Sequence, residues 1–170
     1  MKDLFNQTLI KNGISDPWYF KEGMNFDDKN LWWGDYNKRL VPHEGVDFGY
    51  TINSDGKISN IQESFFVYNF LKGTVIKTIK DFIGESVFIK HDKSEKKRSL
   101  YSIYGHLQTD ISKGPVSSFQ RIGTISSRKD IPVHFHYSLV WIPENIDFKM
   151  LDWKSINTLK TVEFINPFKY

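Results

Sequence analysis

From residue 65 onward, short apolar segments alternate with turn residues. The segments read FFVYNFL, GTVIKTI, ESVFIKH, SLYSIYGHL, RIGTIS and VHFHYSLVWI, and they are rich in β-branched and aromatic residues. Such residues favour strands, and short apolar runs separated by turns are typical of antiparallel sheets. We therefore predict a mainly β fold, with an antiparallel β-sheet in a single domain of sandwich type.

The two ends of the chain show a different pattern. Residues 1–40 are aromatic and turn-rich without a sustained period, which predicts an irregular N-terminal segment with a short helix near residues 4–11. Near the C-terminus, the mixed pattern of residues 148–156 predicts a second short helix. Asp55-Gly56 indicates a turn within a surface insertion. We divide the chain into an N-terminal segment, residues 1–40, and a domain of residues 41–170.

Composition limits the chemistry that is available. Hydrophobic residues make up 39% of the 170, which is enough for one core and argues against global disorder. The chain has no cysteine, which excludes disulfides, thiolate metal sites and a cysteine nucleophile. Any metal must therefore be held by histidine and carboxylate side chains.

The charge pattern does not indicate nucleic-acid binding. The net charge of +3 is small, and the densest basic run, residues 93–98, follows a strand-like segment. We interpret this run as a solvated hairpin loop, with contact to an anionic surface as the alternative. No apolar stretch approaches the ~20 residues of a membrane span. The N-terminus shows no apolar core of a signal peptide.

Two histidines lie two residues apart in the segment VHFHYSL. On a strand, His134 and His136 face the same side, with Cα atoms ~7 Å apart. One can then bind a metal while the other stands beside the open position of that metal. The alternative is that both are polar residues on a solvated sheet face.

A second candidate stretch reads PHEGVDFG. In an extended chain, His43 and Asp47 share one face but lie ~13 Å apart at their Cα atoms, so a shared metal requires a bend, which Gly45 permits. The alternative is an ordinary turn with an exposed histidine. A further histidine, His106, follows Gly105 at the end of an alternating stretch, where a partly buried, hydrogen-bonded histidine is the default interpretation.

Taken together, two histidines and one aspartate form a ligand set that suits catalytic zinc, which keeps a fourth position for water. Two further histidines remain to handle protons or to stabilise an oxyanion. No Ser-His-Asp motif and no phosphate-binding loop competes with this interpretation. The aromatic run WWGDYN, residues 32–37, precedes the first ligand and is predicted either to wall the groove or to pack in the core.

The motifs PHEGVDFG, YGHL and VHFHYSL, in this order, resemble the signature of the lysostaphin/LytM-type M23 zinc metallopeptidases. The resemblance covers about residues 40–142, and the closing INPF is similar to the end of such domains. By position, His43, Asp47 and His136 resemble the three metal ligands, and His106 and His134 resemble the two catalytic histidines that do not bind metal. His91, at the end of ESVFIKH, matches a strand histidine that we interpret as structural.

The resemblance implies an M23-like fold, one Zn²⁺ ion, and a zinc-dependent endopeptidase that hydrolyses cross-links or stem peptides of bacterial peptidoglycan. Zinc would activate a water molecule, and because the chain has no HExxH motif, proton handling falls to His106 or His134. The expected partner is a peptidoglycan peptide, and the expected location is periplasmic, or extracellular at the cell wall. Glu44, beside a ligand, is expected to point away from it.

Several alternatives remain open at this point. One is a non-catalytic or latent M23-like module that binds the wall or activates another hydrolase. Another is a sheet-rich binding domain that holds adventitious metal, and a third is a peptidase for a non-wall substrate. The loop before the His-x-His pair, ISSRKDIP, lacks the glycines usual in the family, and Tyr137-Ser138 replace an acidic residue. Residues 1–40 are also a candidate inhibitory cover, whose trimming to about residue 30 would raise activity.

Overall fold

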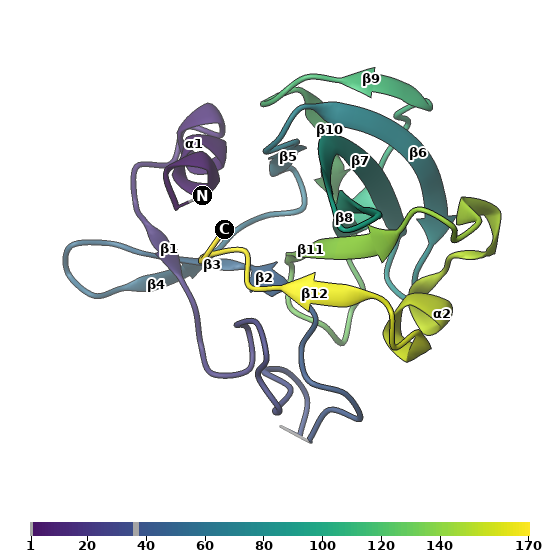
Figure 1. Cartoon of the computed structure of the whole chain (residues 1–170). Coiled ribbons are helices and arrows are strands. Elements are labelled where there is room, and N and C mark those ends of the chain that lie inside the picture. The colour runs from purple at the N-terminus through teal and green to yellow at the C-terminus, as the bar shows by residue number, and fades with distance from the viewer. Residues whose placement is uncertain (1, 36–37) are drawn as a thin grey trace.

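The chain folds into two antiparallel sheets in this computed structural model, which describes residues 2–35 and 38–170 (Figure 1). The strands are β1 (Trp18–Tyr19), β2 (Val46–Phe48), β3 (Tyr50–Ile52), β4 (Ile58–Asn60), β5 (Phe66–Tyr68), β6 (Gly73–Lys80), β7 (Glu85–Glu95), β8 (Arg98–Gln108), β9 (Gly114–Val116), β10 (Arg121–Ile125), β11 (Phe135–Pro143) and β12 (Glu163–Ile165). The main sheet follows the order β12-β11-β8-β7-β6-β9, β2 pairs with β11, and β10 links β8 to β5. The predicted mainly antiparallel β fold is confirmed.

The helices lie near the two ends of the chain. Helix α1 (Lys2–Lys11) and helix α2 (Trp153–Thr158), with a 3₁₀ turn at Phe148–Met150, fall where the sequence predicts short helices. Asp152 caps α2, because its side chain accepts a hydrogen bond from the Ser155 backbone N–H at 2.7 Å and its own N–H donates to the Ser155 hydroxyl at 2.8 Å. This reciprocal cap fixes the start of α2, and with it the position of Trp153.

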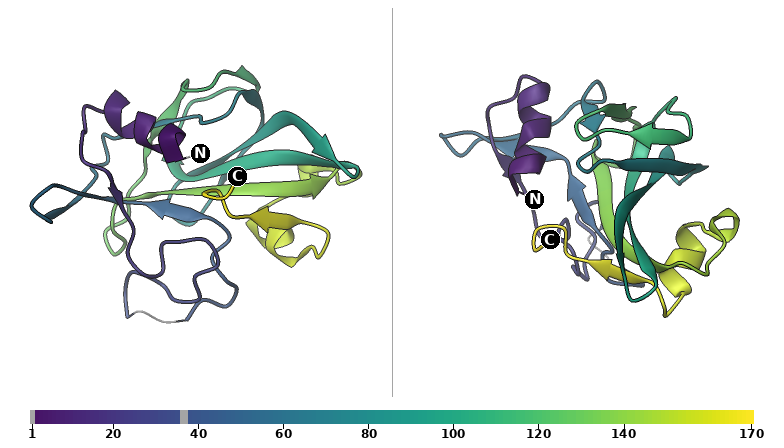
Figure 2. Two further views of the ribbon diagram at one scale, coloured as in Figure 1. Left: turned by 60° about the vertical axis from the view of Figure 1, so that its left-hand side comes forward. Right: turned by 45° about the horizontal axis from the view of Figure 1, so that its top comes forward.

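The strand β11 is covered on both faces, which explains why it is apolar at nearly every position. Phe135, Tyr137 and Leu139 point into the main core, which also contains Phe5 and other side chains of α1. On the opposite face, Val140 and its neighbours pack in a second cluster with side chains of α2. Figure 2 shows the two helices on opposite sides of the sheet. The face that carries His136 is therefore the face covered by α2.

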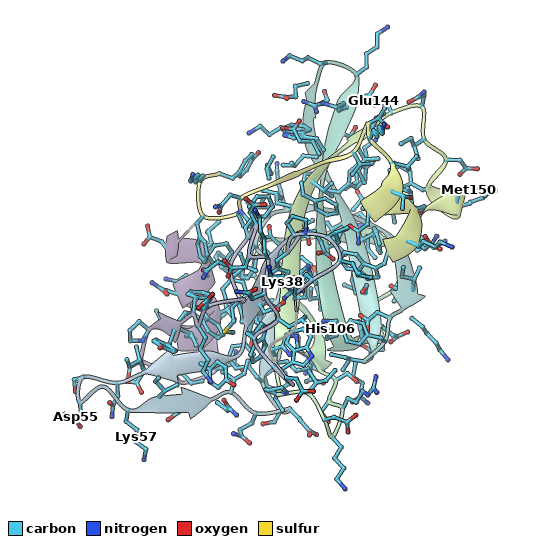
Figure 3. The ribbon with its side chains drawn as sticks, turned by 90° about the horizontal axis from the view of Figure 1, so that it is seen from below. Lys38, Asp55, Lys57, His106, Glu144 and Met150 are labelled. Atoms are coloured by element: carbon cyan, nitrogen blue, oxygen red, sulfur yellow. The ribbon has the colours of Figure 1, made fainter. Side chains whose placement is uncertain are left out.

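Two hairpins extend from the sheets. The turn predicted at Asp55-Gly56 connects β3 and β4, and the tip of this hairpin points away from the main sheet (Figure 3). The basic run of residues 93–98 lies at the end of the β7–β8 hairpin, where residues 92–97 are exposed. The predicted solvated hairpin loop is thus confirmed. His106 lies toward the opposite end of the main sheet from Glu144 (Figure 3).

Candidate metal centre

The pairing of β2 with β11 brings two of the predicted ligands together. Asp47 and His136 are direct partners in this antiparallel ladder, a position that puts side chains of the same face within about 5 Å of each other. His43 lies just before β2, beyond a bend at residue 45. On the other side of His136 the partner is Gly105 of β8, which has no side chain to occupy the space of the imidazole.

The three side chains turn one atom each toward a common point. Nε2 of His43 lies 3.2 Å from Nδ1 of His136 and 3.2 Å from Oδ1 of Asp47, and Nδ1 of His136 lies 2.8 Å from that oxygen. All three residues are buried. Four-coordinate zinc with bonds of about 2.0–2.1 Å separates its ligand atoms by about 3.3 Å. The geometry and the donor set therefore fit a tetrahedral zinc ion with one open position.

Glycine is required at position 45 for a second reason, the close approach of the backbone to the His136 ring, which the sequence did not reveal. A Cβ atom at this position would lie 2.6 Å from Nε2 of His136 and would also overlap the backbone oxygen of Tyr137. The segment can thus pass close to the imidazole only with glycine at position 45. The predicted bend is present, and the tight approach is the stronger constraint.

Hydrogen bonds on the outer nitrogens set the tautomers of the histidines. Nδ1 of His43 lies 3.0 Å from the Asn25 carbonyl oxygen, and Nδ1 of His134 lies 2.7 Å from that of Pro132. A carbonyl only accepts, so each Nδ1 carries the proton and each Nε2 keeps its lone pair. Nε2 of His136 lies 2.6 Å from the Ser138 hydroxyl, which can accept its proton, so Nδ1 can present a lone pair to a cation. Metal-binding histidines in proteins are fixed in the same way.

The carboxylate of Asp47 uses its two oxygens differently. Oδ1 faces the histidines, whereas Oδ2 accepts a hydrogen bond from the Trp32 indole N–H at 2.7 Å and lies 3.6 Å from Nη2 of Arg39. Burial alone would raise the pKa of Asp47, but His43, His134 and His136 outweigh it and hold the pKa well below its usual value. The carboxylate is therefore ionised, as a metal ligand must be.

His134 lies beside this cluster, with its Nε2 turned toward Asp47. Its Nε2 lies 4.0 Å from Oδ1 of Asp47 and has no hydrogen-bond partner in the part of the chain that the structure describes. Burial lowers the pKa of His134 to about 4, against the opposing charge of Asp47. The imidazole is therefore neutral near pH 7 and presents a lone pair to the cluster.

His106 is held by Asp81, a residue that the sequence analysis missed. The backbone N–H of His106 donates to Oδ2 of Asp81 at 2.9 Å, and its ring Nδ1 lies 3.3 Å from the same oxygen. Asp81 also accepts from the Gly84 N–H and the Ser86 hydroxyl, both at 2.7 Å. Burial raises the pKa of Asp81, but His106 and the Gly84 N–H outweigh it and lower that pKa. In the sequence, Asp81 shows only as part of a turn, DFIG.

A cavity of about 520 Å³ opens beside the cluster. Its lining includes Trp33, Phe82 and Trp153, which come from three different segments. The Trp153 ring lies 5.4 Å from the His136 ring, and its indole N–H donates to the Ser86 hydroxyl at 2.8 Å. Aromatic side chains around an open cavity provide apolar surface against which a substrate can pack.

The aromatic run before His43 divides between the two predicted roles. Trp32 is buried and Trp33 lines the cavity, while residues 36 and 37 lie outside the described residues. Glu44 lines the same cavity, and the expectation that its carboxylate points away from the ligands stays a prediction. Residue 44 precedes β2, so strand alternation does not govern its direction.

His91 lies outside this cavity. Its ring bonds the Lys72 carbonyl oxygen, just before β6, at 2.9 Å and the Ser102 hydroxyl of β8 at 3.0 Å. Burial lowers its pKa, so the ring is neutral and its contacts are structural, as the sequence analysis expects.

Neither helix of the described residues has the length and apolar character that crossing a membrane requires.

Comparison with known proteins gives structural similarities only. No protein-family model matches the chain, and no curated sequence matches it. A zinc-containing peptidase from Vibrio cholerae is 24% identical over 68% of this chain, with a TM-score of 0.48, and this chain spans 31% of that protein. A point mutant of the catalytic domain of the prophage-encoded M23 protein EnpA from Enterococcus faecalis is 22% identical over 73% of this chain and 90% of its own, with a TM-score of 0.45.

A chain of the SpoIIIAH–SpoIIQ complex is 19% identical over 86% of this chain and 89% of its own, with a TM-score of 0.49. The solved structures similar to this chain thus include M23 peptidase domains, the family that its ordered motifs resemble.

Proposed function

We propose that this chain is a zinc-dependent endopeptidase of the M23 type that hydrolyses peptide cross-links or stem peptides of bacterial peptidoglycan. The observation that carries the proposal is the convergence of Nε2 of His43, Oδ1 of Asp47 and Nδ1 of His136 at mutual distances of 2.8–3.2 Å. These atoms would hold the zinc ion. When bound, zinc supplies Lewis-acid polarisation of a carbonyl group and lowers the pKa of a water molecule.

The other two histidines would handle protons beside the metal position, His106 from the lining of the cavity and His134 from the position next to it. Nε2 of His134 has a lone pair and no protein partner among the described residues, so it is placed to accept a proton. The charge of Asp81, 3.3 Å away but not hydrogen-bonded to the ring, would favour a proton on Nδ1 of His106, which leaves Nε2 of that ring for contact with a substrate oxygen or nitrogen. The rings of His106 and His134 lie 4.9 Å apart. Both groups can therefore act on one scissile amide.

The cavity supports a peptide substrate rather than a small metabolite. It opens to solvent between aromatic side chains and carries both acidic and basic groups at its edge, among them Glu44, Lys80 and Lys154. An extended peptide carries apolar and charged side chains that can contact these aromatic and charged groups. The wall peptide itself, and a location in the periplasm or at the cell wall, rest on the resemblance of the three motifs to M23 enzymes.

Digestion of defined muropeptides, with products identified by mass, tests this proposal. The zinc-loaded protein should release peptide fragments, and the His136→Ala variant should lose both bound zinc and hydrolysis. A matched control is His91→Gln, which replaces a buried histidine outside the cavity and should retain both. Full activity of the His136→Ala variant would end the metallopeptidase proposal. One bound zinc without hydrolysis of any wall peptide would favour the non-catalytic module instead.

A further inference from the structure

The segment before His43 wraps around the outside of the candidate metal centre. The backbone oxygen of Met24 accepts a hydrogen bond from the Asp47 N–H at 2.9 Å, and that of Asp28 accepts one from the His43 N–H at 2.9 Å. The carbonyl oxygen of Asn25 bonds the His43 ring at 3.0 Å. Residues 24–28 thus position both of these ligands, although they lie in the part of the chain predicted to be irregular.

Trp32 makes the most direct contact from this segment to a ligand. Its side chain is 2% exposed, and its indole N–H donates to Oδ2 of Asp47 at 2.7 Å. The ring packs at 5.0 Å against the His134 ring and at 5.6 Å against the ring of Tyr50. These ring contacts and the hydrogen bond together restrict the direction of the N–H group, because a buried side chain is held in one of a few staggered rotamers.

Arg39 joins the two ends of this segment. Its Nη2 donates to the Gly23 carbonyl oxygen at 3.1 Å and its Nε to that of Asn30 at 3.2 Å. The same Nη2 lies 3.6 Å from Oδ2 of Asp47. The positive charge of Arg39 therefore sits next to the oxygen that already accepts the Trp32 N–H, and both groups attract the same end of the carboxylate.

We propose that Trp32, assisted by Arg39, is a positioning residue of the metal centre. By holding Oδ2 of Asp47, these side chains leave Oδ1 alone to face the cation, which favours ligation through one oxygen and keeps the fourth position open. This inference rests on the proposed zinc site at His43, Asp47 and His136. It also makes residues 23–32, together with Arg39, a structural part of the site rather than a removable cover.

The role differs from that of an inhibitory segment in a measurable way. Trimming the chain to about residue 30 would remove the Asn25 and Met24 carbonyl groups that hold His43 and Asp47. Loss of these outer contacts lowers metal affinity in comparable sites by about 10- to 100-fold. The inference therefore predicts weaker zinc binding after trimming, whereas an inhibitory cover predicts higher activity.

The Trp32→Phe variant tests the inference in the full chain, with Trp18→Phe as its matched control. Phenylalanine keeps an aromatic ring but lacks the N–H group; Trp18 also donates its indole N–H to a protein oxygen, the Phe5 carbonyl at 3.0 Å, and does not line the cavity. Zinc affinity is measured by competition with a chromophoric chelator, and the ligand field by the visible spectrum of the Co²⁺-substituted protein. We expect Trp32→Phe to weaken zinc binding by about 10- to 100-fold and to shift the Co²⁺ bands. Trp18→Phe should stay within about threefold of the unmodified chain.

The outcomes separate this inference from the proposed function. If the unmodified chain binds zinc and Trp32→Phe keeps both its affinity and its Co²⁺ spectrum, the positioning role is wrong while the zinc site stands. If the unmodified chain takes up no zinc, the proposed function itself fails. Should Trp32→Phe not fold, Arg39→Met decides: an affinity fall of threefold or more supports the role, and unchanged affinity overturns it.

Discussion

Substitution of Gly45 by alanine probes the site through a single methyl group. The backbone of Gly45 does not adopt the left-handed region, so alanine meets no conformational penalty there. The added Cβ, however, would lie 2.6 Å from Nε2 of His136, whereas ordinary contact begins near 3.4 Å. Because the Cβ would also overlap the backbone oxygen of Tyr137, the imidazole and the backbone at residue 45 must move apart, by about 0.8 Å for the contact with Nε2. A shift of this size is large against zinc bonds of about 2.0–2.1 Å.

Two quantities should change in the Gly45→Ala variant. Overpacking of a tight site costs about 1–3 kcal/mol in the free energy of unfolding, measured by urea titration of the metal-free protein. Zinc affinity should fall by at least about 10-fold, because one ligand nitrogen is displaced. The comparison variant is Gly105→Ala, whose Cβ would lie 3.3 Å from Cβ of the same histidine; this neighbour must yield by only a few tenths of an ångström, so the loss of zinc affinity should be smaller than in Gly45→Ala. Zinc affinity within threefold of the unmodified chain in Gly45→Ala would refute this reasoning.

Three further substitutions test other parts of the account. Trp153→Ala should raise KM for a cleaved peptide by about 10-fold, because one aromatic contact with the substrate is worth roughly 1–1.5 kcal/mol, and it should leave zinc affinity unchanged. An unaltered KM would show that Trp153 does not contact the substrate. Asp81→Asn should lower the free energy of unfolding by about 2 kcal/mol at pH 7. The pKa of Asp81 is lower in the folded than in the unfolded protein, so this stabilisation is present above the unfolded value of about 3.9 and is lost as the pH falls through the folded pKa. In urea titrations, the difference in stability between Asp81→Asn and the unmodified chain should therefore shrink below about pH 4. A difference that stays constant with pH would contradict the assignment. Phe5→Ala removes a buried ring of α1 that packs on Phe48 at 5.1 Å, so unfolding should become easier by about 3–5 kcal/mol, and a change below 1 kcal/mol would show that α1 is not part of the core.

The strands were predictable because their residues carry the signal locally. The β11 segment is β-branched and aromatic, and the alternation that placed His134 and His136 on one face also placed Phe135 and Tyr137 in the core. The order of the three motifs then indicated which side chains meet. The structure brings His43, Asp47 and His136 together, whereas their role as zinc ligands stays a prediction.

The contacts that complete the site were not predictable, because they depend on tertiary pairing. Asp81 is separated from His106 by the whole of β7 and most of β8, and nothing in the turn DFIG shows which strand end it will face. Trp32 gave an aromatic signal, but burial area and hydrogen bonding to Asp47 cannot be distinguished from composition.

X-ray absorption spectroscopy of the zinc-loaded protein tests the central claim most directly, since it reports the type and distance of the atoms around the ion. The account predicts one zinc per chain in four-coordinate geometry, with two imidazole nitrogens and one carboxylate oxygen at about 2.0–2.2 Å and a fourth light atom from solvent. The imidazole contribution should fall to one in the His43→Ala variant if that protein still retains zinc. A six-coordinate shell of oxygen atoms without imidazole, or no zinc uptake at all, would contradict the account.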